Sequence, residues 1–115
     1  MRQGARTPEE LETLFEDAFV IRDREALAEL FEDGAVLGDA WSEARGGDEI
    51  ARLACEMWEH DRTYVAEPRR VLQARNTGLI VAQQGINVVR RCGDGVWRYA
   101  IALLSSDEAT IEEDR

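Results

Sequence analysis

The sequence predicts an α+β domain in which three N-terminal helices pack on one curved antiparallel sheet. Up to His60, apolar residues recur at the three- and four-residue spacing of amphipathic helices. From Thr63 onward, short apolar runs alternate with polar residues and are separated by glycine-containing turns, which is typical of a meander of β-hairpins. A chain of 115 residues fits one domain with one core. We therefore expect a single domain over 1–115, with its core at about 7–105 and an acidic tail at 106–115.

The first helix has a clear start. Thr7 is a capping residue, Pro8 fits the first turn, and Glu10 stands three residues after the cap, where it closes a capping box. The acidic residues of this helix, including Glu12, are expected to face water. The apolar stripe that should face the core is Leu11, Leu14, Phe15, Ala18 and Phe19.

A second, shorter helix should follow almost without a loop. Asp23 is its capping residue, and Leu27, Leu30 and Phe31 carry its apolar stripe. Because glycine adopts the left-handed conformation that ends helices, the helix is expected to stop at Asp33-Gly34.

A third helix is expected over about 48–60, after the glycine pair at 46–47. Helical spacing favours a core role for Met57 and Trp58, although a place in the wall of a pocket stays open. The buried stripe of this helix should be Ile50, Leu53, Ala54, Met57 and Trp58.

The strands are assigned from alternation and from the turns between them. Pro68 should mark a bulge or an edge position, because proline cannot donate a ladder hydrogen bond. Strands are expected over 35–37, 40–45, 63–66, 69–74, 79–84, 86–92 and 96–104. In the last strand, alternation places Trp97, Tyr99, Ile101 and Leu103 on one face and Val96, Arg98, Ala100 and Ala102 on the other.

Charge and hydropathy exclude several classes of protein. The net charge of −10 opposes binding to phosphate backbones, so no nucleic-acid partner is expected. No apolar run approaches the ~18 residues of a membrane span, so no membrane partner is expected either. Residues 1–7 carry arginines but lead into no hydrophobic stretch, which predicts a cytoplasmic protein.

The cysteine and histidine content gives no sign of a metal or cofactor. Cys55 and Cys92 lie far apart, and in a reducing compartment they are expected to be free thiols. With His60 as the one histidine, no tetrahedral zinc set has a recognisable spacing. There is no glycine-rich phosphate loop and no nucleophile elbow, and no cofactor is expected.

The order of elements over 7–105 resembles the nuclear transport factor 2 superfamily, in its SnoaL-like, ketosteroid-isomerase-like branch. Three segments look most like the bacterial SnoaL-like members. They are Asp23 to Asp39 with Leu30-Phe31-Glu32-Asp33-Gly34-Ala35-Val36, then Arg45-Gly46-Gly47-Asp48-Glu49-Ile50, and Val89-Arg90-Arg91 leading through Gly93-Asp94-Gly95 to Trp97-Arg98-Tyr99.

The resemblance implies a cone-shaped, cystatin-like α+β barrel with a strongly curved sheet. It also implies an apolar pocket inside the cone, where a small apolar molecule would bind, and a homodimer formed through the sheet. The hairpin at Gln84-Gly85 is tighter than is usual in the family, so the cone should be shallow.

Asp39 is the first candidate catalytic residue. It follows the first strand, eight residues after Phe31, and by resemblance matches the general-base aspartate of ketosteroid isomerases. The helix-one tyrosine of those enzymes corresponds to Phe15, which has no hydroxyl, whereas Asn87 or Tyr99 is a candidate hydrogen-bond donor. The structural alternative is that Asp39 forms an Asx turn or pairs with an arginine.

Aromatic and apolar side chains are the candidates for ligand contact. His60 is expected simply to bond the end carbonyls of its helix. The strand arginines should pair with carboxylates, with an anion site as the minority interpretation. The candidate ligand-binding residues are Phe15, Phe19, Trp41, Met57, Trp58 and Tyr64.

Three functions follow from these patterns. The leading hypothesis is a small-molecule-binding domain whose ligand is unassigned. The alternatives are a cofactor-independent isomerase, dehydratase or cyclase that uses Asp39 as its base, and a homodimeric interaction module. An enclosed cavity with Asp39 inside would favour the enzyme, and a filled core would favour the interaction module.

Overall fold

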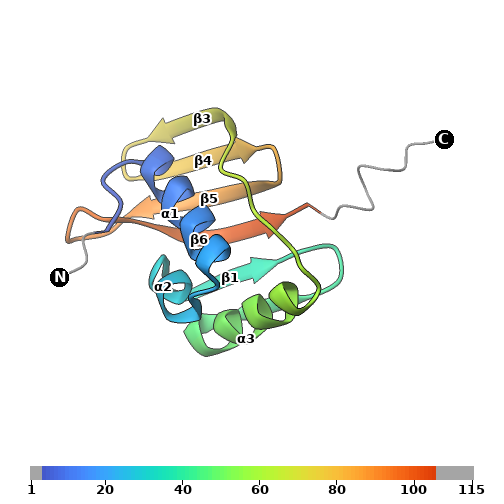
Figure 1. Ribbon diagram of the computed structural model, residues 1–115. Coiled ribbons are helices and arrows are strands. Elements are labelled where there is room, and N and C mark those ends of the chain that lie inside the picture. The colour runs from blue at the N-terminus through green and yellow to red at the C-terminus, as the bar shows by residue number, and fades with distance from the viewer. Residues whose placement is uncertain (1–3, 106–115) are drawn as a thin grey trace.

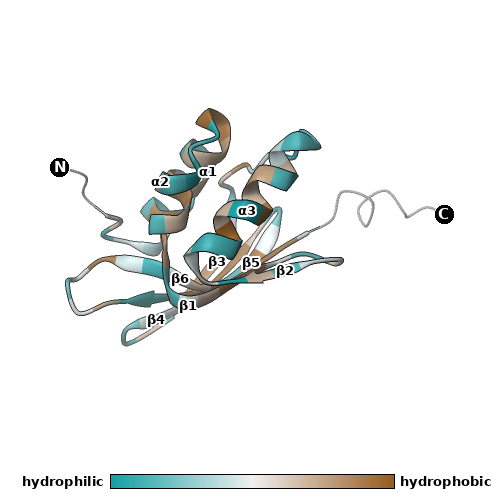
Figure 2. Cartoon of the chain, turned by 90° about the horizontal axis from the view of Figure 1, so that it is seen from below, coloured by the Kyte–Doolittle hydropathy of each residue, from teal (hydrophilic) through white to brown (hydrophobic). Residues whose placement is uncertain are grey.

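The computed structural model describes residues 4–105, in which three helices cover one face of a six-stranded sheet (Figure 1). The opposite face of the sheet carries no helix, as the view from below shows (Figure 2). The helices are α1 (Pro8–Ile21), α2 (Arg24–Glu29) and α3 (Gly46–Glu59). The strands are β1 (Phe31–Gly38), β2 (Glu43–Arg45), β3 (Pro68–Ala74), β4 (Thr77–Ala82), β5 (Gly85–Arg91) and β6 (Trp97–Leu104).

The sheet is mixed, so the expectation of a purely antiparallel sheet was wrong. Its strand order is β2-β1-β6-β5-β4-β3, and four of the five neighbouring pairs are antiparallel. The exception is the pairing of β1 with β6, which is parallel, with Val36 opposite Ile101. A parallel pair needs a long crossover. Here α3 and the β3–β5 meander supply it.

Thr7 and Asp23 cap their helices as predicted, whereas the predicted capping box is shifted by one residue, because Glu10 accepts from Arg6 instead of Thr7. The amide N–H of Glu10 donates to Thr7 Oγ1 at 3.0 Å, and the Glu10 carboxylate accepts from the N–H of Arg6 at 2.7 Å. At the second helix, the N–H of Ala26 donates to Asp23 Oδ1 at 3.0 Å. These side chains satisfy helix-end donors that would otherwise have no intrahelical acceptor.

The second helix is shorter than predicted. It ends at Glu29, and Phe31 already belongs to β1. Gly34, with φ of +74°, lies inside this strand, where the register between β1 and β6 shifts. A glycine with positive φ marks a strand bulge as readily as a helix end, so the signal at Asp33-Gly34 was assigned to the wrong element.

The strand expected over 63–66 does not form. This segment crosses the helical face of the sheet as an irregular connection, and side chains satisfy its backbone donors. The N–H of Val65 donates to the Gln84 side chain at 2.6 Å, and that of Ala66 donates to Glu16 at 3.1 Å. Pro68, in contrast, begins the edge strand β3 beside a register shift, as predicted.

A β-bulge in β6 overturns the predicted faces of that strand. Val88 pairs with Ile101 and Val89 pairs with Tyr99, so Ala100 is the extra residue. Trp97 and Tyr99 share one face, as expected, and both are buried. Beyond the bulge, however, Ala100, Ala102 and Leu104 are buried and Ile101 and Leu103 are exposed.

The core lies between the helices and the sheet and is centred on Phe15. The ring of Phe15 lies 4.7 Å from that of Tyr64, 5.1 Å from that of Tyr99 and 5.2 Å from that of Phe19, measured between centroids. Tilted and edge-on ring packing of this kind adds to the stability that burial supplies.

Candidate functional site

The space between helices and sheet holds a buried carboxylate, Glu12, which is fully enclosed. The hydroxyls of Tyr64 and Tyr99 each donate to it at 2.6 Å, and the Asn87 side-chain amide donates at 2.9 Å. We call these four residues the Glu12 cluster. Glu12 lies on α1, and Tyr64 lies in the connection that leads to β3. Asn87 lies on β5 and Tyr99 on β6, so the cluster joins the helical layer to the sheet.

Burial, followed by the negative charge of Glu12, raises the pKa values of both tyrosines well above their usual range. Each hydroxyl therefore keeps its proton near neutral pH and remains a donor. Hydrogen bonds from neutral hydroxyls to a carboxylate are short and strong. The Asn87 Oδ1 atom is buried without a hydrogen-bond partner among the described residues.

The expectation that Glu12 faces water was wrong. Glu12 stands three residues before Phe15 and seven before Phe19, so it lies on the same helix face as two core rings. That spacing was the available signal. It was missed because glutamate is almost never fully buried unless it is paired, and its partners lie 52 to 87 residues away.

The structure brings most of the predicted ligand contacts together, in the packed core. Phe15, Phe19, Met57, Trp58 and Tyr64 are each at most 5% exposed. Trp41 is different, since it is 79% exposed on the turn between β1 and β2. None of the six lines the groove described below, and their contact with a ligand stays a prediction.

Asp39 lies on the β1–β2 turn with its carboxylate fully engaged. Oδ1 accepts from the N–H groups of Trp41 and Ser42 at 2.9 Å each, which is an Asx turn. Oδ2 lies 3.4 Å from an Arg62 guanidinium nitrogen. Both structural alternatives weighed for Asp39 are therefore present. A catalytic role stays a prediction, and Asn87 and Tyr99 are bonded to Glu12 instead.

The remaining polar candidates have structural partners. His60 Nδ1 bonds to the Glu56 carbonyl near the end of α3 at 3.0 Å, as expected. Among the strand arginines, Arg90 pairs with the Glu32 carboxylate at 3.0 Å, as expected. Arg69 and Arg91 donate instead to the side-chain amides of Gln83 and Asn76, so the expectation of carboxylate partners holds for only part of this set.

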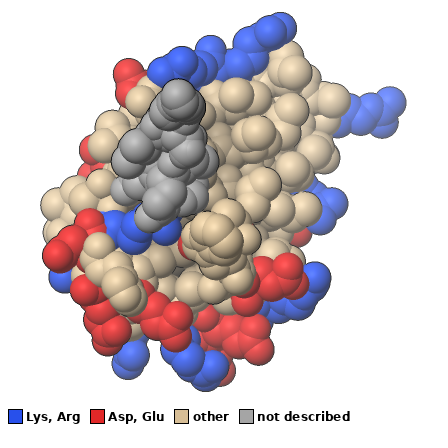
Figure 3. Space-filling model, turned by 90° about the vertical axis from the view of Figure 1, so that its right-hand side faces the viewer, with Lys and Arg blue, Asp and Glu red and all other residues tan. Residues whose placement is uncertain are grey.

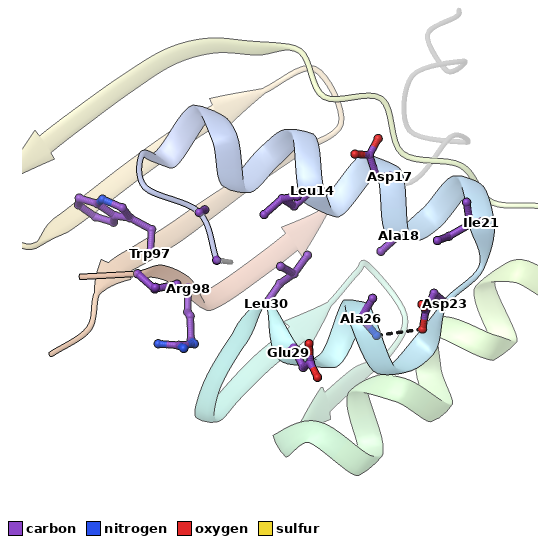
Figure 4. A pocket seen from close by; sticks show the side chains of 13 residues that line it. Leu14, Asp17, Ala18, Ile21, Asp23, Ala26, Glu29, Leu30, Trp97 and Arg98 are labelled. Atoms are coloured by element: carbon purple, nitrogen blue, oxygen red, sulfur yellow. Dashed lines mark hydrogen bonds between the residues drawn. The ribbon is translucent and has the colours of Figure 1, made fainter. Parts of the chain in front are cut away.

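A groove opens on the other side of α1, between α1, α2 and the start of β6 (Figure 4). Its volume is about 480 Å³, which falls within the range of small-molecule sites. We call it the α1–α2 groove. Its apolar walls include Leu14, Ala18, Ile21, Ala26, Leu30 and Trp97.

The rim of this groove carries charge. Asp17, Asp23 and Glu29 supply carboxylates, and Arg98 supplies one guanidinium. The Arg98 group is paired with both oxygens of Asp94, at 3.2 and 3.0 Å. This pairing lowers the pKa of Asp94, so the ion pair persists at neutral pH.

The uncovered face of the sheet is apolar. Ile86 and Leu103 are each 50% exposed and Ile101 is 47% exposed. On the face drawn in Figure 3, basic side chains lie at the β3 end, and acidic and basic side chains lie together at the α3 end. The apolar residues on this outer face include Leu72, Leu79, Val81, Ile86, Val88, Ile101 and Leu103. Two arginines share the face with them, Arg70 opposite Val81 and Arg90 opposite Thr77.

Residues 4–105 contain neither a membrane-spanning helix nor a cluster of metal ligands. No helix there is long and apolar enough to cross a membrane. In the same range, no group of three or more His, Cys, Asp or Glu side chains is placed to hold a metal ion.

Comparison with solved structures shows the fold. The chain is similar to a ketosteroid isomerase-like protein from Erwinia carotovora atroseptica, with a TM-score of 0.68, 21% identity, and coverage of 84% of this chain and 91% of that one. It is similar to an NTF2-like protein with a cystatin-like fold from Novosphingobium aromaticivorans, with a TM-score of 0.69, 16% identity and coverage of 93% and 86%.

A third similar structure, from Thiobacillus denitrificans, is classed as a calcium/calmodulin-dependent protein kinase type II association domain. Its TM-score is 0.75 at 16% identity, with coverage of 90% of this chain and 98% of that one. No family model matches the chain, and no curated protein sequence matches it. At these identities the likeness establishes the fold alone, and it confirms the predicted cystatin-like α+β architecture.

Proposed function

Because this chain has the nuclear transport factor 2-like fold, we propose that it is a small-molecule-binding domain whose site is the α1–α2 groove. The ligand is a small, largely apolar molecule. The observation that carries the proposal is a cavity of about 480 Å³ with mostly apolar walls and a few polar groups at its rim, which is the usual form of such sites.

The packed interior supports this location over the inside of the cone. The Glu12 cluster and the rings around Phe15 fill the space where the resemblance implied a pocket. A ligand placed there would have to displace the short hydrogen bonds to Glu12, and each buried donor left without a partner costs about 1–3 kcal/mol.

Octanol is a suitable probe, and backbone amide shifts in NMR spectra are the readout. We expect saturable shifts at the groove residues named above. Ala26→Phe should fill the groove and abolish them, whereas the matched change Ala51→Phe on α3, which does not line the groove, should leave them intact. Shifts confined to core residues such as Phe15 and Tyr64, or no saturable shifts, would rule out the groove as the site.

The filled core and the apolar outer face of the sheet favour a second candidate function, self-association as a homodimer. Half-exposed Ile86, Ile101 and Leu103 form one row across β5 and β6, and exposed patches of this kind mark interaction surfaces. A second copy is the favoured partner, since the similar structure from Thiobacillus denitrificans is classed as an association domain.

Light scattering tests the homodimer. We expect about twice the chain mass of 13.0 kDa for the natural chain and the single-chain mass for Ile101→Glu. The matched control is Val20→Glu, which changes an apolar residue that is 71% exposed on α1, and it should stay dimeric. A natural chain that remains single at micromolar concentrations excludes this candidate.

A further inference from the structure

The rim of the α1–α2 groove indicates the charge of its ligand. Building on the proposed function, we propose that the groove binds an amphiphilic cation, an apolar body that carries a protonated amine. The walls supply the apolar contact, and carboxylates at the rim supply the electrostatic contact.

Asp17 is the central group in this proposal. On α1, Leu14, Asp17, Ala18 and Ile21 stand at i, i+3, i+4 and i+7, so they share one helix face. Asp17 is part of the groove lining, and its carboxylate lies at the outer rim, on the edge of α1 that is turned away from α2 (Figure 4). Asp17 has no hydrogen bond or ion pair with another described residue, and its charge remains available to a ligand.

The other charges of the groove are already engaged. Asp23 Oδ1 accepts from the Ala26 N–H at the start of α2. Arg98, the one basic residue lining the groove within residues 4–105, is held by both oxygens of Asp94. Since its one guanidinium is paired outside the groove, the groove is left with a net negative charge.

The rest of the chain acts in the same direction. With a net charge of −10, the protein repels anions and raises the local concentration of cations near its surface. For an anionic amphiphile, repulsion by the carboxylates at the rim would offset the binding free energy gained from contact with the apolar walls. A neutral one would gain from the walls alone.

Three probes with one apolar body separate these cases. They are octylamine, octanol and octanoate, titrated near neutral pH into the full chain and followed by the NMR shifts of groove residues. We expect octylamine to bind about fivefold tighter than octanol, because an exposed ion pair contributes little more than that factor. Octanoate should bind most weakly, and added salt should reduce the spread.

Two variants assign the preference to Asp17. Asp17→Asn should bring the affinity for octylamine down to the affinity for octanol measured in the same variant. Glu56→Gln, an exposed acid on α3 away from the groove, changes the net charge equally and should leave the preference intact.

The outcomes distinguish this inference from the proposed function. Equal binding of octylamine and octanol, or an unchanged preference in Asp17→Asn, would refute the inference that the ligand is a cation. Neither result would contradict the groove as a binding site. Failure of all three probes to shift groove residues overturns both the inference and the groove site.

Discussion

The Glu12 cluster and the α1–α2 groove are built from opposite sides of the same helix, yet they differ in every physical respect. The cluster is closed, and its carboxylate accepts three hydrogen bonds. The groove is open, and its Asp17 carboxylate lacks a partner among the described residues. On α1, Glu12, Phe15 and Phe19 face the core around the cluster, whereas Leu14 and Ile21 line the groove.

This difference shows how a small domain separates stability from binding. A buried carboxylate tolerates few changes, because every donor aimed at it loses its partner when it is removed. An exposed carboxylate beside an apolar groove contributes little to folding and is free to select a ligand. Variants of the Glu12 cluster should therefore lower stability, whereas variants of Asp17 should change ligand binding and leave stability nearly unchanged.

The largest effect is expected for Glu12→Ala. It leaves the Tyr64 and Tyr99 hydroxyls and the Asn87 amide buried without their acceptor, and it opens a cavity beside Phe15. We expect a loss of about 3 kcal/mol or more in the free energy of unfolding, measured with urea. The control Glu9→Ala, in the exposed first turn of the same helix, should cost about 0.5 kcal/mol. A loss below 1 kcal/mol in Glu12→Ala would show that the cluster does not hold the layers together.

A somewhat smaller effect is expected from alkaline pH. The folded pKa values of Tyr64 and Tyr99 lie above the usual value of 10.0, so the stability they contribute is complete below that pH and is lost as pH rises above it. The free energy of unfolding should fall by about 1.4 kcal/mol per pH unit for each tyrosine.

The composition makes this titration easy to interpret. The chain has no lysine, and these are its only two tyrosines. Tyr64→Phe should therefore halve the slope, while replacement of Cys55 and Cys92 by serine should leave it unchanged. A flat profile above pH 10 would mean that the hydroxyls ionise as easily in the folded chain as in the unfolded one.

Asp39→Asn should have a modest effect. Asparagine retains the oxygen that accepts from Trp41 and Ser42, so the turn persists and only the Arg62 pair is lost, at a cost of about 1 kcal/mol or less. Octanol binding in the groove should not change. If Asp39 is a general base, this variant abolishes turnover of an enolisable ketone that the natural chain converts, so activity of the natural chain is the measurement that decides.

The smallest effect on folding is expected for Asp17→Asn. Because the side chain is exposed and has no partner among residues 4–105, the free energy of unfolding, measured by thermal unfolding, should change by no more than about 0.5 kcal/mol. Loss of the octylamine preference without loss of stability would complete the contrast with Glu12→Ala. A large destabilisation would instead assign Asp17 to the fold.

Local signals in the sequence were sufficient for most of the fold. The caps at Thr7 and Asp23 and the edge position of Pro68 follow from properties of single residues and their near neighbours. The parallel direction of β1 against β6 has no such signal, since it depends on a crossover of many residues. The bulge at Ala100 also has no local signal in the sequence, because alanine fits either face of a strand.

The site was less predictable than the fold because it depends on what meets in space. Helical spacing placed Phe15 and Phe19 on one face, but it did not show that Tyr64, Asn87 and Tyr99 would converge on Glu12 and fill that space. The groove has walls from three separate elements. Its α1 wall was not recognised, because Leu14 and Ala18 were assigned to the core-facing stripe and Asp17 to a solvated face.

The parallel pairing of β1 with β6 also fixes the order in which the domain can be completed during synthesis. Val36 and Ile101 are neighbours in the sheet although they lie roughly 65 residues apart in the chain, and contacts of such separation form slowly. All three helices leave the ribosome before β6 does, and their apolar stripes stay without a finished sheet until then. A nascent chain that ends before Trp97 can pair β1 only with the short strand β2.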